Sequence, residues 1–331
     1  MPTPTMDDYV KLLCTLFERF VQEHPEHESA LLRYSNQMMI VLFTIFELRR
    51  IFKFKAQRRW LEDHPEMLQR LGWTSIPHRV TLSRRYKTLY PVLQAFVQFV
   101  GQYAREVDAR LRQRHLVSDK SLFKALGPVW HEVDRQAQRI PAKLRHLDTD
   151  ATWSKSGYHG WVYGYGLHLT CNEAACPALV QVETAAVAEA TVIEQQEPTS
   201  LQTLKPQTLA ADNRYAKASR LRRWAKQGVV LLTPASQWRK GRFAQAYQRY
   251  RKQPVNARRL RLRRTTIEPL FDLITKVLGT TAKQKQLPVQ FLPNVRTCLA
   301  LATLSLQLAM LANSIWGLPL RNISTMITAF S

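Results

Sequence analysis

The pattern of apolar positions changes once along the chain, near Pro141. Before that residue, apolar side chains recur mostly at spacings of three and four, which is typical of one buried face of a helix. The longest such series comprises Val92, Leu93, Phe96, Val100, Tyr103, Val107 and Leu111. Met38–Phe46 is strongly apolar and is followed by Arg49 and Arg50. We therefore predict that residues 1–140 form an all-helical domain.

After Pro141 the alternation of apolar and polar residues indicates strands. Leu147, Thr149 and Ala151 alternate with Asp148 and Asp150, which predicts a short strand with both carboxylates on one face. Residues 160–171 are rich in aromatic and β-branched side chains, and residues 178–184 alternate again. These three runs predict an antiparallel meander.

Helices and strands alternate in the next part of the chain. Helices are expected over residues 187–196 and 216–227, and strands over residues 207–211 and 229–233. A meander followed by this alternation predicts an α/β domain over residues 141–331, with a mixed sheet flanked by helices. Residues 297–312 form an apolar run of 16 positions, shorter than the roughly 18 to 20 that span a bilayer, so we expect a buried helix there.

The excess of basic residues indicates the kind of partner that the protein binds. The chain has 331 residues, with 48 Lys plus Arg against 25 Asp plus Glu and a formal net charge of +23. Residues 213–267 contain 17 of the basic residues and no acid. Phe243, Tyr247 and Tyr250 are interleaved in the densest part, residues 239–264, and Trp238 lies just before it. A solvated helix face normally mixes both signs, and a membrane-binding helix needs an apolar stripe that this segment lacks. Nucleic acid is therefore the expected partner.

A second basic element lies near the start of the chain. In LGWTSIPHRVTLSRRYKTL, Pro77 and the hydroxyl residues after it predict a turn and a helix start, and Arg84, Arg85 and Lys87 belong to that helix. Two interpretations stay open: the recognition helix of a helix-turn-helix element, or a packed helix with its basic face in water.

Cysteine usage and the N-terminus bear on location. Four cysteines in a chain of this size give no disulfide framework and no zinc-ligand spacing, and no basic segment followed by an apolar one opens the sequence. We expect a reduced, cytoplasmic protein.

Acidic residues are scarce in the part of the chain that is rich in basic residues. From Pro198 to the last residue the only acids are Asp212, Glu268 and Asp272. Carboxylates among phosphate-binding residues repel the ligand unless cations lie between them, which suggests two divalent ions, Mg²⁺ or Mn²⁺. Asp150, Asp212 and Glu268 are the candidate ligands. The alternatives are a helix N-cap for Asp212 and an acid in a first helical turn for Glu268, which Pro269 places near a helix start.

Several segments, in order, resemble the DDE transposases of bacterial insertion sequences, whose catalytic domain is RNase H-like. DATWSKSGYHGWVYGYGLHL resembles the segment of the first carboxylate, and VETAAVAEA, with an acid at Glu189, resembles the strand end and helix that follow. LAADNRYAKASRLRRW resembles the second-aspartate motif, and RLRRTTIEPLFDLITKV resembles the glutamate helix.

The resemblance implies that Asp150, Asp212 and Glu268 form the metal-binding triad, with Asp148 as an alternative first ligand. It also implies that Arg264 contacts phosphate, as the arginine of a YREK-type signature. Arg261 holds the tyrosine position of that signature, Thr275 holds the lysine position, and Lys276 follows one residue later. Arg259, Arg261, Arg264, Lys276, Arg84 and Arg85 are the expected DNA-binding residues.

The resemblance further implies Mg²⁺-dependent cleavage and transfer of double-stranded DNA at element ends, by a homodimer associated with the nucleoid. The rival hypothesis is a non-catalytic DNA-binding protein derived from a decayed transposase, in which the acids act only as caps. A third hypothesis is a basic protein anchored in a membrane by the apolar helix over residues 297–312.

Overall fold

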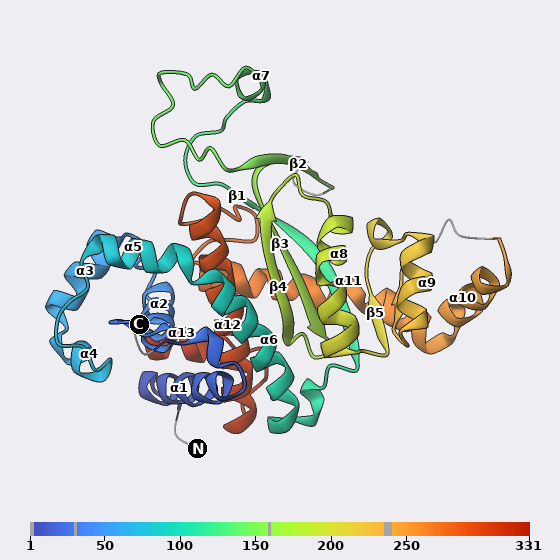
Figure 1. Cartoon of the computed structure of the whole chain (residues 1–331), viewed down its shortest axis with the longest axis horizontal. Coiled ribbons are helices and arrows are strands. Elements are labelled where there is room, and N and C mark those ends of the chain that lie inside the picture. Colours follow the sequence, from blue (N-terminus) through green and yellow to red (C-terminus); the bar gives the residue numbers. More distant parts are fainter. Residues whose placement is uncertain (1–2, 30–31, 158–159, 235–239) are drawn as a thin grey trace.

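The computed structural model describes residues 3–29, 32–157, 160–234 and 240–331. The N-terminal part is helical and lies to one side of the sheet (Figure 1). Thr5 and Asp8 form a capping box that starts the first helix. The helices of this region are α1 (Met6–Glu23), α2 (Asn36–Leu48), α3 (Phe54–Asp63), α4 (Pro65–Arg70), α5 (Arg79–Thr88) and α6 (Tyr90–Val107).

A mixed sheet occupies the middle of the molecule. β1 pairs with β3 antiparallel and with β5 parallel, and β5 pairs with β6 parallel. β2 and β4 pair antiparallel with successive parts of the long strand β3, so β1 is a central strand. The strands are β1 (His115–Lys124), β2 (Thr152–Ser156), β3 (Gly160–Asn172), β4 (Pro177–Thr184), β5 (Thr208–Ala210) and β6 (Val230–Leu232).

Helices cover both faces of the sheet, because apolar side chains alternate between the faces of its strands. One face carries Phe123, Tyr165 and Leu167 and packs within the large core that includes α6, α11 (Pro254–Val277) and α12 (Leu292–Ile315). The opposite face packs against α8 (Glu189–Pro198) and α9 (Ala218–Lys226). The remaining helices are α7 (Glu132–Gln136), α10 (Arg242–Lys252) and α13 (Ser324–Phe330). The predicted α/β architecture, with a mixed sheet flanked by helices behind a helical region, is confirmed.

Helix α12 is the centre of the hydrophobic core. It contacts α1, α2, α5 and α6 of the helical region and also β4 of the sheet. Its 24 residues are long and apolar enough to cross a membrane, but 89% of its apolar window is buried inside the protein. The predicted buried helix is therefore present, and packing against both regions accounts for its hydropathy.

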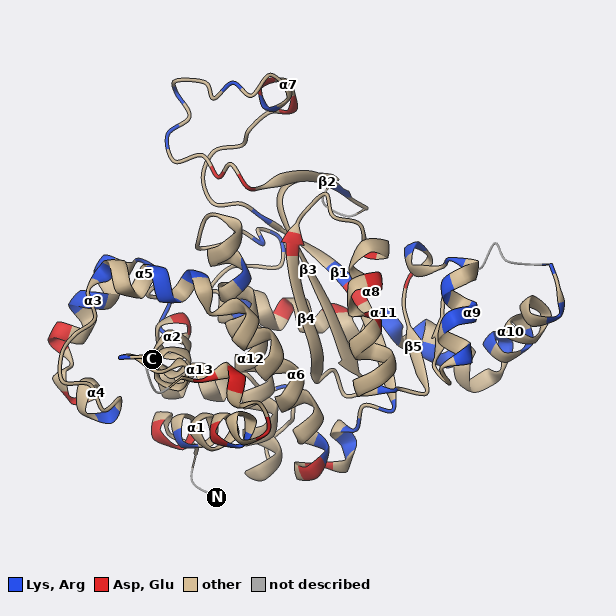
Figure 2. Ribbon diagram, viewed as in Figure 1, with Lys and Arg blue, Asp and Glu red and all other residues tan. Residues whose placement is uncertain are grey.

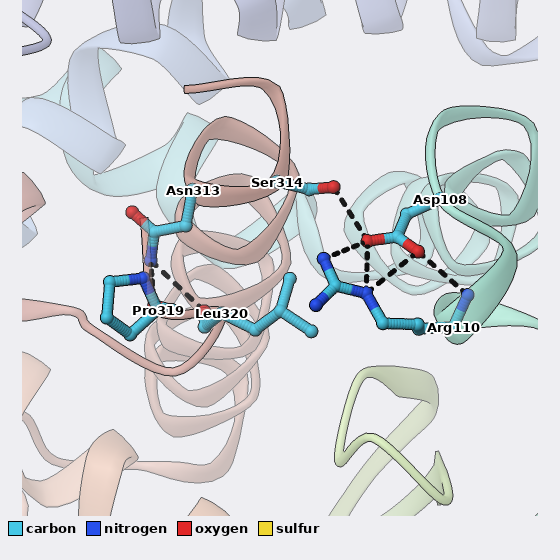
Figure 3. A network of polar contacts seen from close by, with 6 residues as sticks. All are labelled: Asp108, Arg110, Asn313, Ser314, Pro319 and Leu320. Carbon is cyan, nitrogen blue, oxygen red and sulfur yellow. Dashed lines mark hydrogen bonds and ion pairs between the residues drawn. The ribbon is translucent and has the colours of Figure 1, made fainter. Parts of the chain in front are cut away.

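The C-terminal end of α12 is fixed by polar contacts (Figure 3). The Ser314 hydroxyl donates to Asp108 Oδ2 at 2.8 Å, and Arg110 Nη2 donates to the same oxygen at 2.6 Å. The Asn313 amide donates to the carbonyls of Pro319 and Leu320, both at 3.1 Å. Because Asp108 ends α6, the Ser314 bond joins the last turn of α12 to the segment that leads into the sheet, whereas the Asn313 bonds hold the turn that follows α12.

Three sequence-based expectations differ from the structure. The boundary predicted at residue 140 falls inside the sheet-forming part, because β1 supplies a central strand from His115–Lys124. Residues 147–151 are not a strand; β2 starts only at Thr152. Pro269 does not begin a helix, since α11 runs through it from Pro254 to Val277. One cluster of buried residues extends from Tyr9 to Phe330, so the helical region and the sheet share a core.

Candidate active site

The parallel pairing of β1 and β5 brings two aspartates to the same part of the sheet. Val117 of β1 is in register with Ala210 of β5. Asp119 and Asp212 each follow two residues after that pair, so they lie at matching positions on neighbouring parallel chains. The sheet therefore places two carboxylates from distant parts of the sequence beside each other.

An open cavity of about 850 Å³ contains both aspartates. Its walls come from β1, from the end of β2, from the start of α8 and from the turn after β5. The other wall is formed by α11 and the segment after it. The charged residues of the lining are Asp119, Lys120, Lys155, Glu189, Asp212, Arg214, Arg264, Glu268, Asp272, Lys283 and Lys285. The cavity thus combines carboxylates with a surrounding set of cations.

The carboxyl group of Asp119 has a raised pKa. Burial raises the pKa of Asp119 to about 6, and the charges of Asp212 and Glu189 act in the same direction. The Arg263 guanidinium on α11 and a hydrogen bond from the Lys120 N–H, at 2.9 Å, oppose this rise. A carboxylate held beside two others in a partly desolvated cavity is the arrangement that a cation would relieve.

Glu268 enters the cavity from the middle of α11. Its side chain is 60% exposed, and Arg264, one helical turn earlier, lies 3.8 Å away by Nε–Oε1. The first-turn interpretation of Glu268 is wrong, because 14 residues of α11 precede it. The N-cap interpretation of Asp212 does hold: its Oδ1 accepts the Arg214 N–H at 2.7 Å. That role does not remove Asp212 from the cavity.

Glu189, the acid at the start of α8, is buried in the cavity wall. Its Oε1 lies 3.2 Å from Nη1 of Arg214, which is 63% exposed on the turn that follows Asp212. This ion pair joins α8 to the second-aspartate segment.

Asp150 lies outside the described lining of the cavity. Its Oδ2 accepts the N–H of Leu292 at 2.9 Å, at the first turn of α12. Asp148 is fully buried; it accepts the N–H of Phe291 at 3.0 Å and the Tyr165 hydroxyl at 2.7 Å. Both carboxylates therefore satisfy backbone donors at the N-terminus of α12, where the helix dipole favours negative charge. Of the expected triad, Asp212 and Glu268 line the cavity together with Asp119, whereas Asp150 lies elsewhere.

The donor chemistry of the cavity suits a hard divalent cation. Asp119, Asp212 and Glu268 offer carboxylate oxygens, which Mg²⁺ and Mn²⁺ prefer. Among the residues that the structure describes, however, no three His, Cys, Asp or Glu side chains are gathered closely enough to hold one ion. Binding an ion to all three would require their side chains to turn toward it.

The expected DNA-binding residues divide into two groups. Arg261, Arg264, Lys276 and Arg84 are exposed on α11 and α5. Arg85 instead points inward and donates to the carbonyl of Tyr34 at 3.2 Å. Arg259 is half-buried and lies 3.3 Å from Glu173 by Nε–Oε1.

The basic segment, residues 213–267, spreads over α9, α10 and the first half of α11, which form a cationic part of the molecule (Figure 2). Not all of its charge faces outward. Arg220 is 1% exposed and donates to the carbonyls of Tyr215 and Ala190, and Arg263 is also buried. The Tyr247 side chain is buried and its hydroxyl donates to the Leu231 carbonyl. The expected contributions of Trp238 and Arg239 lie outside the described residues.

Sequence analysis missed Asp119. It stands in LVSDKSLF, where apolar residues flank a polar centre, in a region predicted to be helical. The sequence does carry one signal of a strand. Two apolar pairs, Leu116–Val117 and Leu122–Phe123, begin six positions apart, and this spacing does not continue the helical pattern of the preceding residues. That pattern fits the buried strand that the structure shows.

One comparison with known proteins identifies a family. A family model described as a transposase DDE domain matches residues 113–289. The matched region begins just before β1 and ends before α12, so it includes Asp119, Asp212 and Glu268. No curated protein and no solved structure matches the chain.

Proposed function

The chain belongs to the transposase DDE domain family, and we propose that it cleaves DNA strands at the ends of an insertion sequence and transfers them to a target. We assign Asp119, Asp212 and Glu268 as the carboxylates of the reaction. The observation that carries this assignment is the cavity that these three side chains line, from strand β1, from the turn after the parallel strand β5 and from helix α11.

Members of this family generally use divalent metal ions, and we propose Mg²⁺, or Mn²⁺ in its place, as two ions. When bound, such ions activate the attacking oxygen and stabilise the leaving oxygen of an in-line displacement at phosphorus. Asp119 and Asp212 would hold them from the sheet, while Glu268 would do so from α11. Arg264, next to Glu268, would bind a phosphate oxygen and balance the charge that grows in the transition state.

We propose that double-stranded DNA lies along the exposed cations of α10 and α11. Arg261, Arg264 and Lys276 would contact phosphates there, whereas Arg84 of α5 would contact DNA in the helical region. Arg259 and Arg85, which are engaged by protein groups, would position their helices instead. Pairing of two element ends requires a homodimer, acting in the cytoplasm at the nucleoid.

Site-directed variants test the assignment. Asp119→Asn, Asp212→Asn and Glu268→Gln should each abolish cleavage of a duplex covering the element terminus in Mg²⁺ or Mn²⁺, while gel-shift affinity for that duplex remains. Asp150→Asn is the matched control, because it makes the same chemical change outside the cavity; it should keep most of the activity. Normal cleavage by Asp119→Asn, or its loss in Asp150→Asn at unchanged thermal stability, would overturn the assignment.

A non-catalytic DNA-binding protein is the second candidate. It is favoured by the spread of the three carboxylates, and by the contact of Glu268 with Arg264 rather than with another acid. Under this alternative the wild-type chain binds the duplex and leaves it uncut in every divalent metal tested.

A further inference from the structure

Among the residues that the structure describes, six cations line the candidate active site. Five of them either contact protein oxygens or are exposed at its rim. Lys120 donates from Nζ to the backbone carbonyls of Ala185, at 2.8 Å, and Val187, at 2.7 Å. Arg214 pairs with Glu189 and Arg264 lies near Glu268. The side chains of Lys155 and Lys283 are exposed at the rim. The list of the six is Lys120, Lys155, Arg214, Arg264, Lys283 and Lys285.

Lys285 differs from the other five. It is half-buried, and its ammonium donates to the Ser121 hydroxyl at 2.9 Å. Among the described residues, no carboxylate oxygen lies within 4.0 Å of this ammonium. A lysine ammonium has three N–H donors, so it retains donors for a ligand while Ser121 keeps it in place. It can therefore bind an anion without first breaking an ion pair.

The backbone fixes Lys285 at this position. The Lys124 N–H donates to the Lys285 carbonyl at 2.8 Å, and Leu287 N–H donates to the Lys124 carbonyl at 2.9 Å. These bonds attach the segment after α11 to the end of β1. Lys285 has a φ of +43°, in the left-handed region that costs a non-glycine residue energy and persists only where surrounding contacts hold it.

The side chain is also positioned by its neighbours. Its Nζ lies 5.9 Å from the centre of the Phe123 ring and 5.8 Å from that of Phe271. Ser121, its hydrogen-bond partner, follows Asp119 by two residues and so shares the same face of β1, about 7 Å further along. The ammonium is thus held on the inner wall of the cavity, close to the acid that we assign as the first carboxylate.

Lys276 of α11 cannot replace it. Thr275, seven residues after Glu268, lies on the same side of the helix but is buried and donates to the Asp272 carbonyl. Lys276 is one residue later, which turns it about 100° away from Thr275. It is exposed, and the described lining of the cavity does not include it.

We propose that Lys285 binds the phosphate of the DNA strand at the reacting position, through a non-bridging oxygen. This inference rests on the proposed function. It names a phosphate-binding residue in the segment after α11, which supplies none of the three assigned carboxylates. Ser121 is then a positioning residue that directs the Lys285 ammonium.

Binding to two DNAs tests the proposal. The first probe is a duplex covering the element terminus; the second is the same duplex with a neutral methylphosphonate at the phosphate that the wild type cleaves. Lys285→Met should weaken binding of the first duplex about tenfold and lower the slope of log affinity against log salt by about 1. It should bind the second duplex as the wild type does. Because both DNAs are bound by the same preparation, partial unfolding cancels from the comparison.

Cleavage gives the second measurement. Lys285→Met should lower the cleavage rate about a hundredfold, as does removal of a single donor to the transition-state charge in other enzymes. Lys285→Arg should restore most of it. Lys11→Met, which removes an exposed lysine of α1, is the control for loss of one positive charge.

Two results would overturn the proposal: a wild-type cleavage rate in Lys285→Met, or an equal loss of affinity for the charged and the neutral duplex. Neither result bears on Asp119, Asp212 and Glu268. Conversely, cleavage by the carboxylate variants would refute the proposed function and leave the binding comparison at Lys285 intact.

Discussion

The substitution Asp148→Ala tests whether the Asp148 carboxylate stabilises the fold or takes part in catalysis. Asp148 accepts the Tyr165 hydroxyl at 2.7 Å, the Phe291 N–H at 3.0 Å and the Asp150 N–H at 3.3 Å. The variant leaves the buried Tyr165 donor and the Phe291 N–H without their acceptor. Each loss of this kind costs about 1–3 kcal/mol, so we expect a total destabilisation of about 3 kcal/mol.

Thermal unfolding measures this change. At about 2.1 cal/mol/K per residue, a chain of 331 residues has an unfolding entropy of about 0.7 kcal/mol/K, so the melting temperature should fall by about 4 °C. Asp7→Ala is the control: Asp7 pairs with Arg70 on the surface, and its loss should cost less than about 1 kcal/mol. Cleavage per folded molecule should persist in Asp148→Ala. An unchanged melting temperature combined with loss of cleavage would refute this account and restore the first-ligand role expected from sequence.

Three further substitutions probe the packing. Burial raises the pKa of Glu47, so wild-type stability should fall as pH rises above about 4.5, by up to about 1.4 kcal/mol per unit, and urea denaturation of Glu47→Gln should lack this slope. Gly164→Ala would place a Cβ 1.9 Å from the Phe123 carbonyl oxygen, so we expect a loss of about 3 kcal/mol in the same assay. Hydrogen bonds from Arg110 hold the pKa of Asp108 below its usual range, so Asp108→Asn should remove a part of the stability that the wild type loses below about pH 4.

Much of the sheet was predictable from the sequence. The strands over residues 160–171 and 178–184, and the short strands before Asp212 and at residues 229–233, follow from alternation and β-branched content, and all are present. β1 was not predictable in the same way. Four polar residues, Ser118–Ser121, lie at its centre. Three of them, Asp119, Lys120 and Ser121, line the cavity, and the Lys120 ammonium also donates to the Ala185 carbonyl.

An acidic residue can be selected from the sequence as a candidate ligand where the surrounding residues are basic and other acids are few. Asp212 and Glu268 stand alone in a basic stretch, so both could be selected from the sequence. Asp119, Asp148 and Asp150 lie in a part of the chain with more acids, where local patterns do not distinguish a cavity wall from a helix terminus. Only the parallel register of β1 with β5 makes that distinction.

Charge counts likewise overestimated the outer surface. Arg85, Arg220 and Arg263 belong to basic runs that predict solvent-exposed phosphate ligands, yet each is turned toward the protein. Their long side chains satisfy carbonyl groups at helix ends or approach the Asp119 carboxylate. Sequence composition predicts the sign of the charge on a surface but not whether an individual arginine side chain points toward solvent or toward the protein.

The burial of α12 between the helical region and the sheet determines which inactivating mutations leave a folded protein. A premature stop codon before Leu292 would strip the N-terminal helices of their main apolar partner, so the shortened polypeptide should aggregate rather than persist as a repressor. A missense change at a single carboxylate would leave the whole chain folded. Inactive members of the family that remain folded should therefore retain a helix in the position of α12.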